Sequence, residues 1–229
     1  MIESYYIGAY WGSRTEPLAQ VKNKILQTLQ RLAEIDEQFL NWYEEANSRE
    51  KALGKKVSID ADSVERLCLE MVRKGELDEK GFAEMGFLFG IWSGHLDDES
   101  SNISFNVGKA FTSQHLSNSC VITIPFEGAA RERLLQIDKA KKIIALLVEI
   151  WNPDYAVLTS HQLRDKLNVA NKVGWITYRQ SIKNTPMVNN RVSYEKLNNG
   201  YLFTTAFSID KDTDSSINEL LKLKSYLIS

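Results

Sequence analysis

The N-terminal segment constrains the fold more than any other part of the chain. Residues 4–11 read Ser-Tyr-Tyr-Ile-Gly-Ala-Tyr-Trp, a run of aromatic and β-branched side chains. A strand that is apolar on both faces indicates a central position in a sheet. Pro17 then suits the first turn of a helix, and apolar residues at three- and four-residue spacing predict an amphipathic helix over residues 17–35. The chain is therefore expected to begin with a central strand and a long helix.

The middle of the chain predicts an antiparallel meander. Over residues 85–126, apolar and polar residues alternate as in half-buried strands. Gly86, Gly90 and Gly94 recur there at every fourth position. On a strand this spacing puts the glycines on one face, where they indicate a bend or the close approach of another backbone or ring.

The remaining elements complete an α+β pattern, in which long helices flank a mainly antiparallel sheet. The other predicted strands span residues 39–45, 155–160, 173–179 and 201–207. The other predicted helices span residues 129–151 and 161–167, and two more start at the capping pairs Asp62 with Glu65 and Ser216 with Glu219. The charged residues 47–56 are typical of a loop. Because no linker or internal repeat is evident, we predict a single domain over residues 1–229.

Composition narrows the class of function. The chain has 229 residues, and its charges sum to 28 − 30 = −2. A general nucleic-acid binder needs a basic footprint and a DNA mimic needs a large negative excess, so this balance argues against both. Residues 1–20 lack the apolar core of a secretory signal, and the longest apolar runs are too short to span a membrane. We expect a soluble, cytoplasmic protein without direct nucleic-acid or membrane binding.

Motifs for cofactor, metal or nucleophile chemistry are missing. The sequence contains no Gly-x-Gly-x-x-Gly, Walker-type or Gly-x-Ser-x-Gly motif, and Cys68 and Cys120 are read as buried hydrophobes. His95, His115 and His161 are too far apart along the chain for a helix-borne metal pair. A metal site would need carboxylates brought in from elsewhere in the fold. We therefore expect no cofactor and no metal.

The most suggestive catalytic pattern is Ser93, His95 and Asp97, which would share one face of a strand. Same-face neighbours on a strand are about 7 Å apart, whereas a serine–histidine hydrogen bond needs about 3 Å. We therefore interpret the segment as a strand end that runs into an acidic, solvated loop. A hydrolase that uses His95 with Asp97 or Asp98 is the alternative. The nuclease-like triplet at residues 78–80 falls in a predicted loop, so the chain is not expected to be a nuclease itself.

Aromatic and acidic residues are the remaining candidates. Most of the tryptophans are expected to pack in the core, because all of them fall in or at the ends of predicted elements: Trp11, Trp42, Trp92, Trp151 and Trp175. Two acidic patches are candidate partner surfaces, one made of Asp97, Asp98 and Glu99 and the other of Asp210, Asp212 and Asp214. Acidic clusters usually form solvated loops, but they matter when the partner is basic, as nucleases are.

Spaced aromatic and glycine blocks run through nearly the whole chain. They occupy residues 5–12, 39–43, 86–94, 124–125, 151–154 and 173–178. In this order they resemble the immunity protein 52 family of bacterial polymorphic toxin systems. The pattern is carried by Tyr5, Tyr6, Gly8, Trp11, Trp42, Gly90, Trp92, Gly94, Trp151, Pro153, Gly174, Trp175 and Tyr178. Residues 44–60 and 182–199 match nothing in the pattern, so a partner-specific surface is expected in either of them.

The resemblance implies a small α+β protein, encoded beside a toxin, that binds the toxin and neutralises it. The toxin is expected to be a nuclease of the restriction-endonuclease fold, delivered by a type VI or similar contact-dependent system. The matching blocks look like scaffold, so they carry over no catalytic residue. We expect the first acidic patch to contact the toxin, and the second patch after it. A protein-interaction module without a toxin is a third hypothesis.

Overall fold

The computed structural model describes residues 3–73, 75–110, 118–168, 173–182, 191–207, 209 and 214–228, apart from the side chains of residues 214, 215 and 228. Its strands are β1 (Tyr5–Trp11), β2 (Trp42–Glu44), β3 (Lys56–Val57), β4 (Phe87–Trp92), β5 (Asn102–Val107), β6 (Asn118–Thr123), β7 (Tyr155–Ser160), β8 (Ile176–Arg179), β9 (Val192–Leu197) and β10 (Gly200–Thr205). Its helices are α1 (Leu18–Ile35), α2 (Arg49–Leu53), α3 (Ala61–Glu70), α4 (Gly128–Leu134), α5 (Ile137–Trp151), α6 (His161–Leu167) and α7 (Asp214–Ile228). Two 3-10 turns are η1 (Glu37–Phe39) and η2 (Asp97–Glu99).

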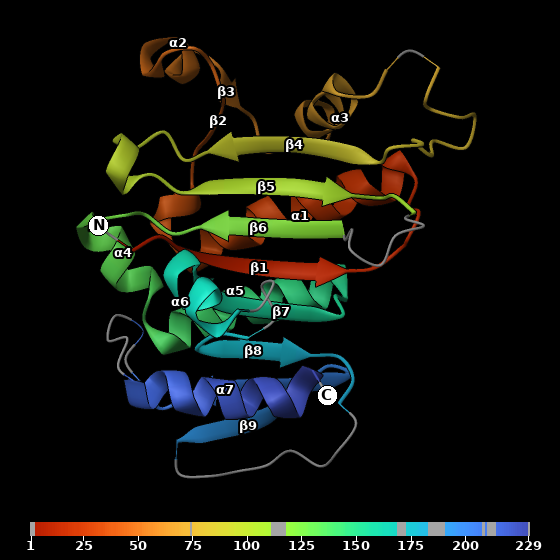
Figure 1. The fold of residues 1–229 in the computed structure, drawn as a ribbon. Helices are drawn as coiled ribbons and strands as arrows, with labels where there is room; N and C mark the ends of the chain where they lie inside the picture. The colour runs from red at the N-terminus through yellow and green to blue at the C-terminus, as the bar shows by residue number, and fades with distance from the viewer. Residues whose placement is uncertain are drawn as a thin grey trace.

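The ten described strands form one sheet in the order β3-β2-β4-β5-β6-β1-β7-β8-β10-β9 (Figure 1). Every pairing between neighbouring strands is antiparallel. Strand β1 lies between β6 and β7, and all seven of its residues are buried. The α+β class, the antiparallel meander from β4 to β6 and the central first strand are therefore confirmed.

One face of the sheet packs against α1 and α5, which lie behind it in Figure 1. Trp11 of β1 stacks on Trp151 of α5, with ring centroids 5.3 Å apart. The indole nitrogen of Trp151 donates a hydrogen bond to the Thr28 hydroxyl of α1 at 3.1 Å. Helix α1 begins directly after Pro17, as predicted. The core interpretation of the tryptophans is confirmed, because all five are buried.

The opposite face is covered over only part of its width by the described helices. In Figure 1, α6 and α7 lie in front of the half of the sheet that runs from β1 towards β9. His161 of α6 packs on Tyr6 with ring centroids 5.1 Å apart, and Lys224 of α7 donates a hydrogen bond to the carbonyl oxygen of Leu167 at 2.8 Å. No described helix lies in front of β4, β5 and β6 (Figure 1).

Two of the spaced glycines sit where another group comes close. Gly94 has a φ of +78°, and a Cβ there would lie 2.3 Å from the ring of Tyr43. Gly86 has a φ of +66°, and a Cβ there would lie 2.5 Å from the carbonyl oxygen of Val107. These contacts confirm the close approach that the spacing indicated, because neither site has room for a side chain. The shared strand face was wrong, because Gly86 and Gly94 flank β4 and only Gly90 lies in it.

The long helix predicted over residues 129–151 is in fact two helices. Helix α4 ends at Leu134 and α5 begins at Ile137, because Gln136 between them has an extended backbone with φ −63° and ψ 130°. Neither glycine nor proline marks the break, and the apolar spacing runs through it. The two helices meet different neighbours, since α4 contacts η2 whereas α5 packs on α1, β1 and β7.

The loop predicted over residues 47–56 was also wrong, because it contains α2 and the start of β3. Ser48 caps α2 by accepting a hydrogen bond from the backbone nitrogen of Lys51, and the small apolar Ala52 is buried. The cap of α3 is Asp60, which accepts from the backbone nitrogen of Ser63 at 2.8 Å, and is not the predicted Asp62.

Other boundaries differ near the ends of elements. The strand predicted over residues 39–45 is shorter, because Phe39 belongs to η1. Strand β8 starts at Ile176 and α7 starts before Ser216. Strand β9 was not predicted at all. It is an edge strand in which only Val192 is buried, so it lacks the apolar alternation by which a strand is recognised.

Candidate functional site

The loop between β4 and β5 presents the first acidic patch at one end of the sheet. Strand β4 ends at Trp92 and β5 begins at Asn102, and between them Asp97, Asp98 and Glu99 form η2 (Figure 1). We call these three residues the acidic turn. None of them is buried. The predicted acidic loop after a strand end is thus present, with a regular 3-10 conformation that the sequence did not indicate.

A buried polar cluster fixes the base of this loop. The backbone nitrogen of Ser93 donates to the carbonyl oxygen of Ser101 at 2.9 Å, and the backbone nitrogen of Ser101 donates to Ser93 Oγ at 3.0 Å. The side-chain amide of Gln38, which is 3% exposed, donates to Ser93 Oγ at 3.2 Å and to the carbonyl oxygen of Glu99 at 2.8 Å. Buried and mutually satisfied groups of this kind specify one conformation.

Further hydrogen bonds hold the outer part of the loop. Ser100 Oγ donates to the carbonyl oxygens of His95 and Leu96, both at 2.9 Å. The backbone nitrogen of Glu127, which caps α4, donates to the carbonyl oxygen of Asp98 at 3.0 Å. The acidic turn is therefore tied to η1 on one side and to α4 on the other.

The carboxylates of the acidic turn have no ion-pair partner among the described residues. Asp36 nearby behaves differently, because Arg133 and Lys139 lie 3.1 and 2.7 Å from its oxygens. Burial alone would raise the pKa of Asp36, but hydrogen bonds from Arg133, Lys139 and the backbone of Gln38 outweigh it and lower the pKa to about 2. The paired carboxylate of Asp36 serves the fold, whereas the unpaired ones face solvent.

Two surface hollows flank the acidic turn. The first has a volume of about 380 Å³, and its lining includes Glu45, Arg49, Trp92, Asp97 and Asn102. Arg49 reaches from α2 and donates to the carbonyl oxygens of Gly94 and His95 at 3.3 and 3.4 Å. The second hollow, of about 440 Å³, is lined by residues of η1, the acidic turn and α4, among them Leu40, Glu99 and Arg133.

Exposed leucines accompany the carboxylates. Leu40 lines the second hollow and is 54% exposed, and Leu96 in the loop itself is 61% exposed. Apolar side chains beside charged ones at a fixed site are common where a protein partner binds. The sequence pattern did not single out Leu40, Leu96, Gln38 or Arg49. Their roles depend on contacts between segments that are distant in the chain.

The structure does not assemble a catalytic group from Ser93, His95 and Asp97. The Ser93 hydroxyl oxygen already accepts hydrogen bonds within the buried cluster. His95 is exposed, and its imidazole makes no hydrogen bond to a described residue. The hydrolase alternative, with His95 and either Asp97 or Asp98, therefore gains no support from the geometry.

The other candidate residues add no site within the described part of the chain. His161 packs on an aromatic ring, and His115 lies outside the described residues. No three His, Cys, Asp or Glu side chains are grouped to hold a metal in the part of the chain that the structure describes. In the second acidic patch, Asp210 and Asp212 lie outside the described residues, as does the side chain of Asp214.

The residues that carry the family resemblance lie mostly inside the molecule. The buried ones are Tyr5, Tyr6, Gly8, Trp11, Trp42, Trp92, Trp151, Pro153, Gly174, Trp175 and Tyr178. Tyr5 and Trp175 pack with ring centroids 5.6 Å apart. Gly8 lies beneath the ring of Tyr10, and a Cβ at Gly174 would lie 2.0 Å from the carbonyl oxygen of Leu158. These residues build the scaffold that presents the loops.

Comparison with known proteins identifies this scaffold. The family model described as immunity protein 52 matches residues 3–205. The chain belongs to the immunity protein 52 family. Among solved structures, a type VI secretion system protein of Pseudomonas aeruginosa has a similar fold, with a TM-score of 0.51 and 14% sequence identity over 99% of this chain and 72% of that chain. No curated protein matches the sequence.

Membership in the immunity protein 52 family confirms the resemblance found in the sequence and implies a toxin as the partner. The match covers β1 through the end of β10, so it includes the acidic turn and both hollows. Among the described helices of this immunity protein 52 family member, none has the length and apolar character needed to cross a bilayer.

Proposed function

We propose that this immunity protein neutralises a secreted nuclease toxin by binding it, without an enzymatic step. The expected toxin has the restriction-endonuclease fold and is delivered by a type VI or similar contact-dependent system. The protein is expected to act in the cytoplasm of the cell that makes it. The observation that carries the proposal is the acidic turn, whose backbone is fixed by hydrogen bonds and whose exposed carboxylates form no ion pair with a described residue.

Charge gives the physical reason for this choice. An enzyme that grips nucleic acid presents cationic groups to the phosphates, so its substrate cleft is basic. Fixed carboxylates on an inhibitor attract such a surface and raise the rate of association. A turn that is already ordered loses little conformational entropy when it binds, which favours affinity. The hydrogen bonds from Gln38 and Ser100 provide that order here.

Two modes of inhibition are compatible with a surface of this kind. The acidic turn either enters the basic substrate cleft and occludes it, or binds elsewhere and blocks a conformation or an assembly that the toxin needs. The modes differ in one observable. Occlusion makes inhibitor and nucleic acid compete for the toxin, whereas a block at a distant surface does not.

A nuclease assay tests the proposal. The toxin encoded beside this gene is purified, and its cleavage of DNA and RNA is measured with increasing amounts of the immunity protein. We expect cleavage to stop near one equivalent of inhibitor. The order of addition separates the two modes, because pre-bound nucleic acid slows inhibition only under occlusion. Full cleavage in the presence of excess immunity protein would contradict the proposal.

A further inference from the structure

The half of the sheet that no described helix covers differs in composition from an ordinary protein surface. Strand register aligns side chains across β4, β5 and β6 on the face opposite α1 and α5. We call these residues the open face: Leu88, Gly90, Asn102, Ser104, Asn106, Ser119, Val121 and Thr123. None of them is charged, although 25% of the residues in the chain are.

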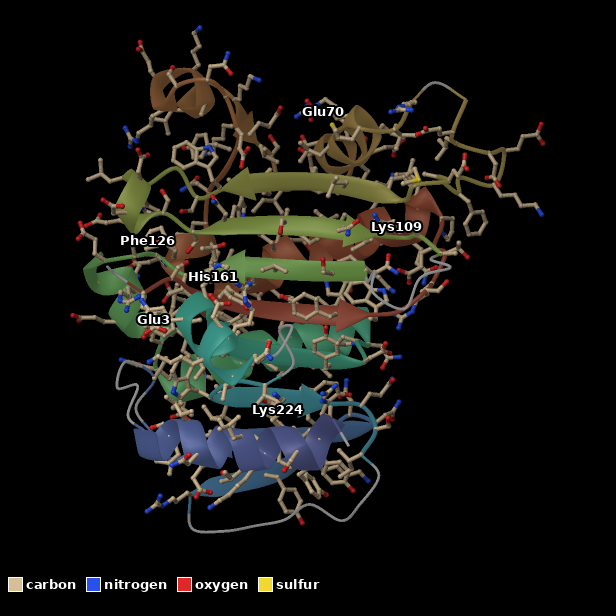
Figure 2. The ribbon with its side chains drawn as sticks, in the orientation of Figure 1. Glu3, Glu70, Lys109, Phe126, His161 and Lys224 are labelled. Carbon is tan, nitrogen blue, oxygen red and sulfur yellow. The ribbon has the colours of Figure 1, made fainter. Side chains whose placement is uncertain are left out.

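The open face is accessible from solvent. Leu88 is 49% exposed, Asn102 and Ser104 are also exposed, and the remaining members are half-buried. Figure 2 shows no described helix between the viewer and these strands, whereas α6 and α7 lie over the other half of the sheet. A sheet face in water normally carries charged side chains, which keep it soluble. Their absence from β4, β5 and β6 needs an explanation.

The middle of the open face is also flat. Gly90, Ser104 and Val121 are aligned across β4, β5 and β6. None of these side chains is longer than that of valine, so a partner can approach the backbone closely. The core of a protein interface is depleted of charge, because a charge buried there loses its hydration.

The open face runs into the acidic turn. Trp92 of β4 and Asn102 of β5 are paired in the row nearest to the loop. Both residues also line the 380 Å³ hollow, together with Asp97 and Glu45. A neutral floor is thus bordered at one end by carboxylates. Protein interfaces have the same arrangement, with an uncharged centre and a polar rim.

We infer that the open face is the central contact for the toxin and that the acidic turn is the rim of the same interface. This inference rests on the proposed function. The matching surface of the toxin is uncharged at its centre and basic along the edge that meets the acidic turn. The carboxylates at the border form no ion pair within the part of the chain that the structure describes, and they favour a basic protein as the occupant.

Charge substitutions at one central residue test the inference. Ser104 is exposed, so Ser104→Arg and Ser104→Asp are expected to fold. Ser181→Arg, at an exposed serine just after β8 and outside the two segments in which a partner-specific surface is expected, is the matched control. Binding to a catalytically inactive form of the toxin is measured by surface plasmon resonance, and circular dichroism confirms folding. Asn102→Lys provides a second variant of the same face if either Ser104 variant unfolds.

We expect both Ser104 variants to lower the affinity at least about 30-fold, because either sign of charge is buried without a partner. The control is expected to bind like the wild type. If Ser104→Arg weakens binding while Ser104→Asp strengthens it, residue 104 responds only to the long-range attraction of a basic toxin, and the open face is not a buried contact.

Failure of the inference is distinguishable from failure of the proposed function. Unchanged binding by both folded variants would overturn the inference and leave the proposed function intact. Absence of binding by the wild type would overturn both. If light scattering shows a dimer of the wild type that Ser104→Arg converts into a monomer with full toxin affinity, a second copy occupies the open face and the inference is wrong.

Discussion

The buried side-chain amide of Gln38 donates a hydrogen bond to the carbonyl oxygen of Glu99 over 2.8 Å. The same amide donates to Ser93 Oγ, so one side chain from η1 bridges both ends of the loop that carries the acidic turn. The order of this loop therefore depends on a residue that is remote in the sequence. A change at buried Gln38 should therefore alter the acidic turn.

Replacing Gln38 with alanine is expected to loosen the acidic turn. The carbonyl oxygen of Glu99 and the hydroxyl of Ser93 lose a buried donor, which costs about 1–3 kcal/mol in the free energy of unfolding. Toxin affinity should fall as well, because binding then has to order the loop. Urea denaturation and surface plasmon resonance measure the two effects. Gln30→Ala, at an exposed position of α1, is the control and should change neither quantity.

Neutralising the acidic turn is expected to slow association with the toxin. The variant Asp97→Asn, Asp98→Asn, Glu99→Gln should reduce the association rate at low salt and weaken its dependence on ionic strength, with little effect on stability. The control variant removes the same charge from exposed carboxylates elsewhere: Glu34→Gln, Glu79→Gln, Glu84→Gln. Equal association rates for both triple variants would show that only net charge matters.

The lowered pKa of Asp36 predicts that the protein loses stability in acid. Its pKa is lowered from 3.8 to about 2, so the folded state holds the ionised form more tightly than the unfolded chain does. The corresponding stabilisation, about 2 kcal/mol, is complete above pH 3.8 and disappears as the pH falls towards 2. Denaturation across this window should show a steeper fall for the wild type than for Asp36→Asn. Parallel curves would contradict the role given to the pairs with Arg133 and Lys139.

The hydrolase alternative makes a separate prediction. His95→Ala should leave protection against the toxin unchanged, because the imidazole is exposed and makes no hydrogen bond to a described residue. Survival of cells that express the toxin with each form of the immunity protein measures this. Loss of protection by a folded His95→Ala variant that still binds the toxin would favour catalysis.

The spacing of apolar residues predicted those elements that have the same kind of environment along their whole length. The first strand is apolar throughout because both of its faces are covered, and α1 carries a regular apolar stripe because it packs on one layer. The break at Gln136 could not be found this way, because the residues on either side have normal helical spacing. The edge strand β9 was not predicted because most of its side chains are exposed, so its sequence shows no alternation of apolar and polar residues.

Of the candidate site, only the charged residues could be predicted from the sequence. The carboxylates of the acidic turn are visible in the sequence as neighbours, and a glycine before them marks the end of a strand. Gln38, Leu40 and Arg49 join the site through tertiary contacts that no local pattern records. The open face likewise exists only once the register of β4, β5 and β6 is known.

Co-expression with the toxin encoded beside the gene tests the central claim most directly, with cell survival and co-purification scored in the same cultures. We predict that the cells survive and that toxin and immunity protein purify as one stable complex. Survival without a complex would contradict inhibition by binding, and death of the cells despite soluble immunity protein would contradict the immunity function itself.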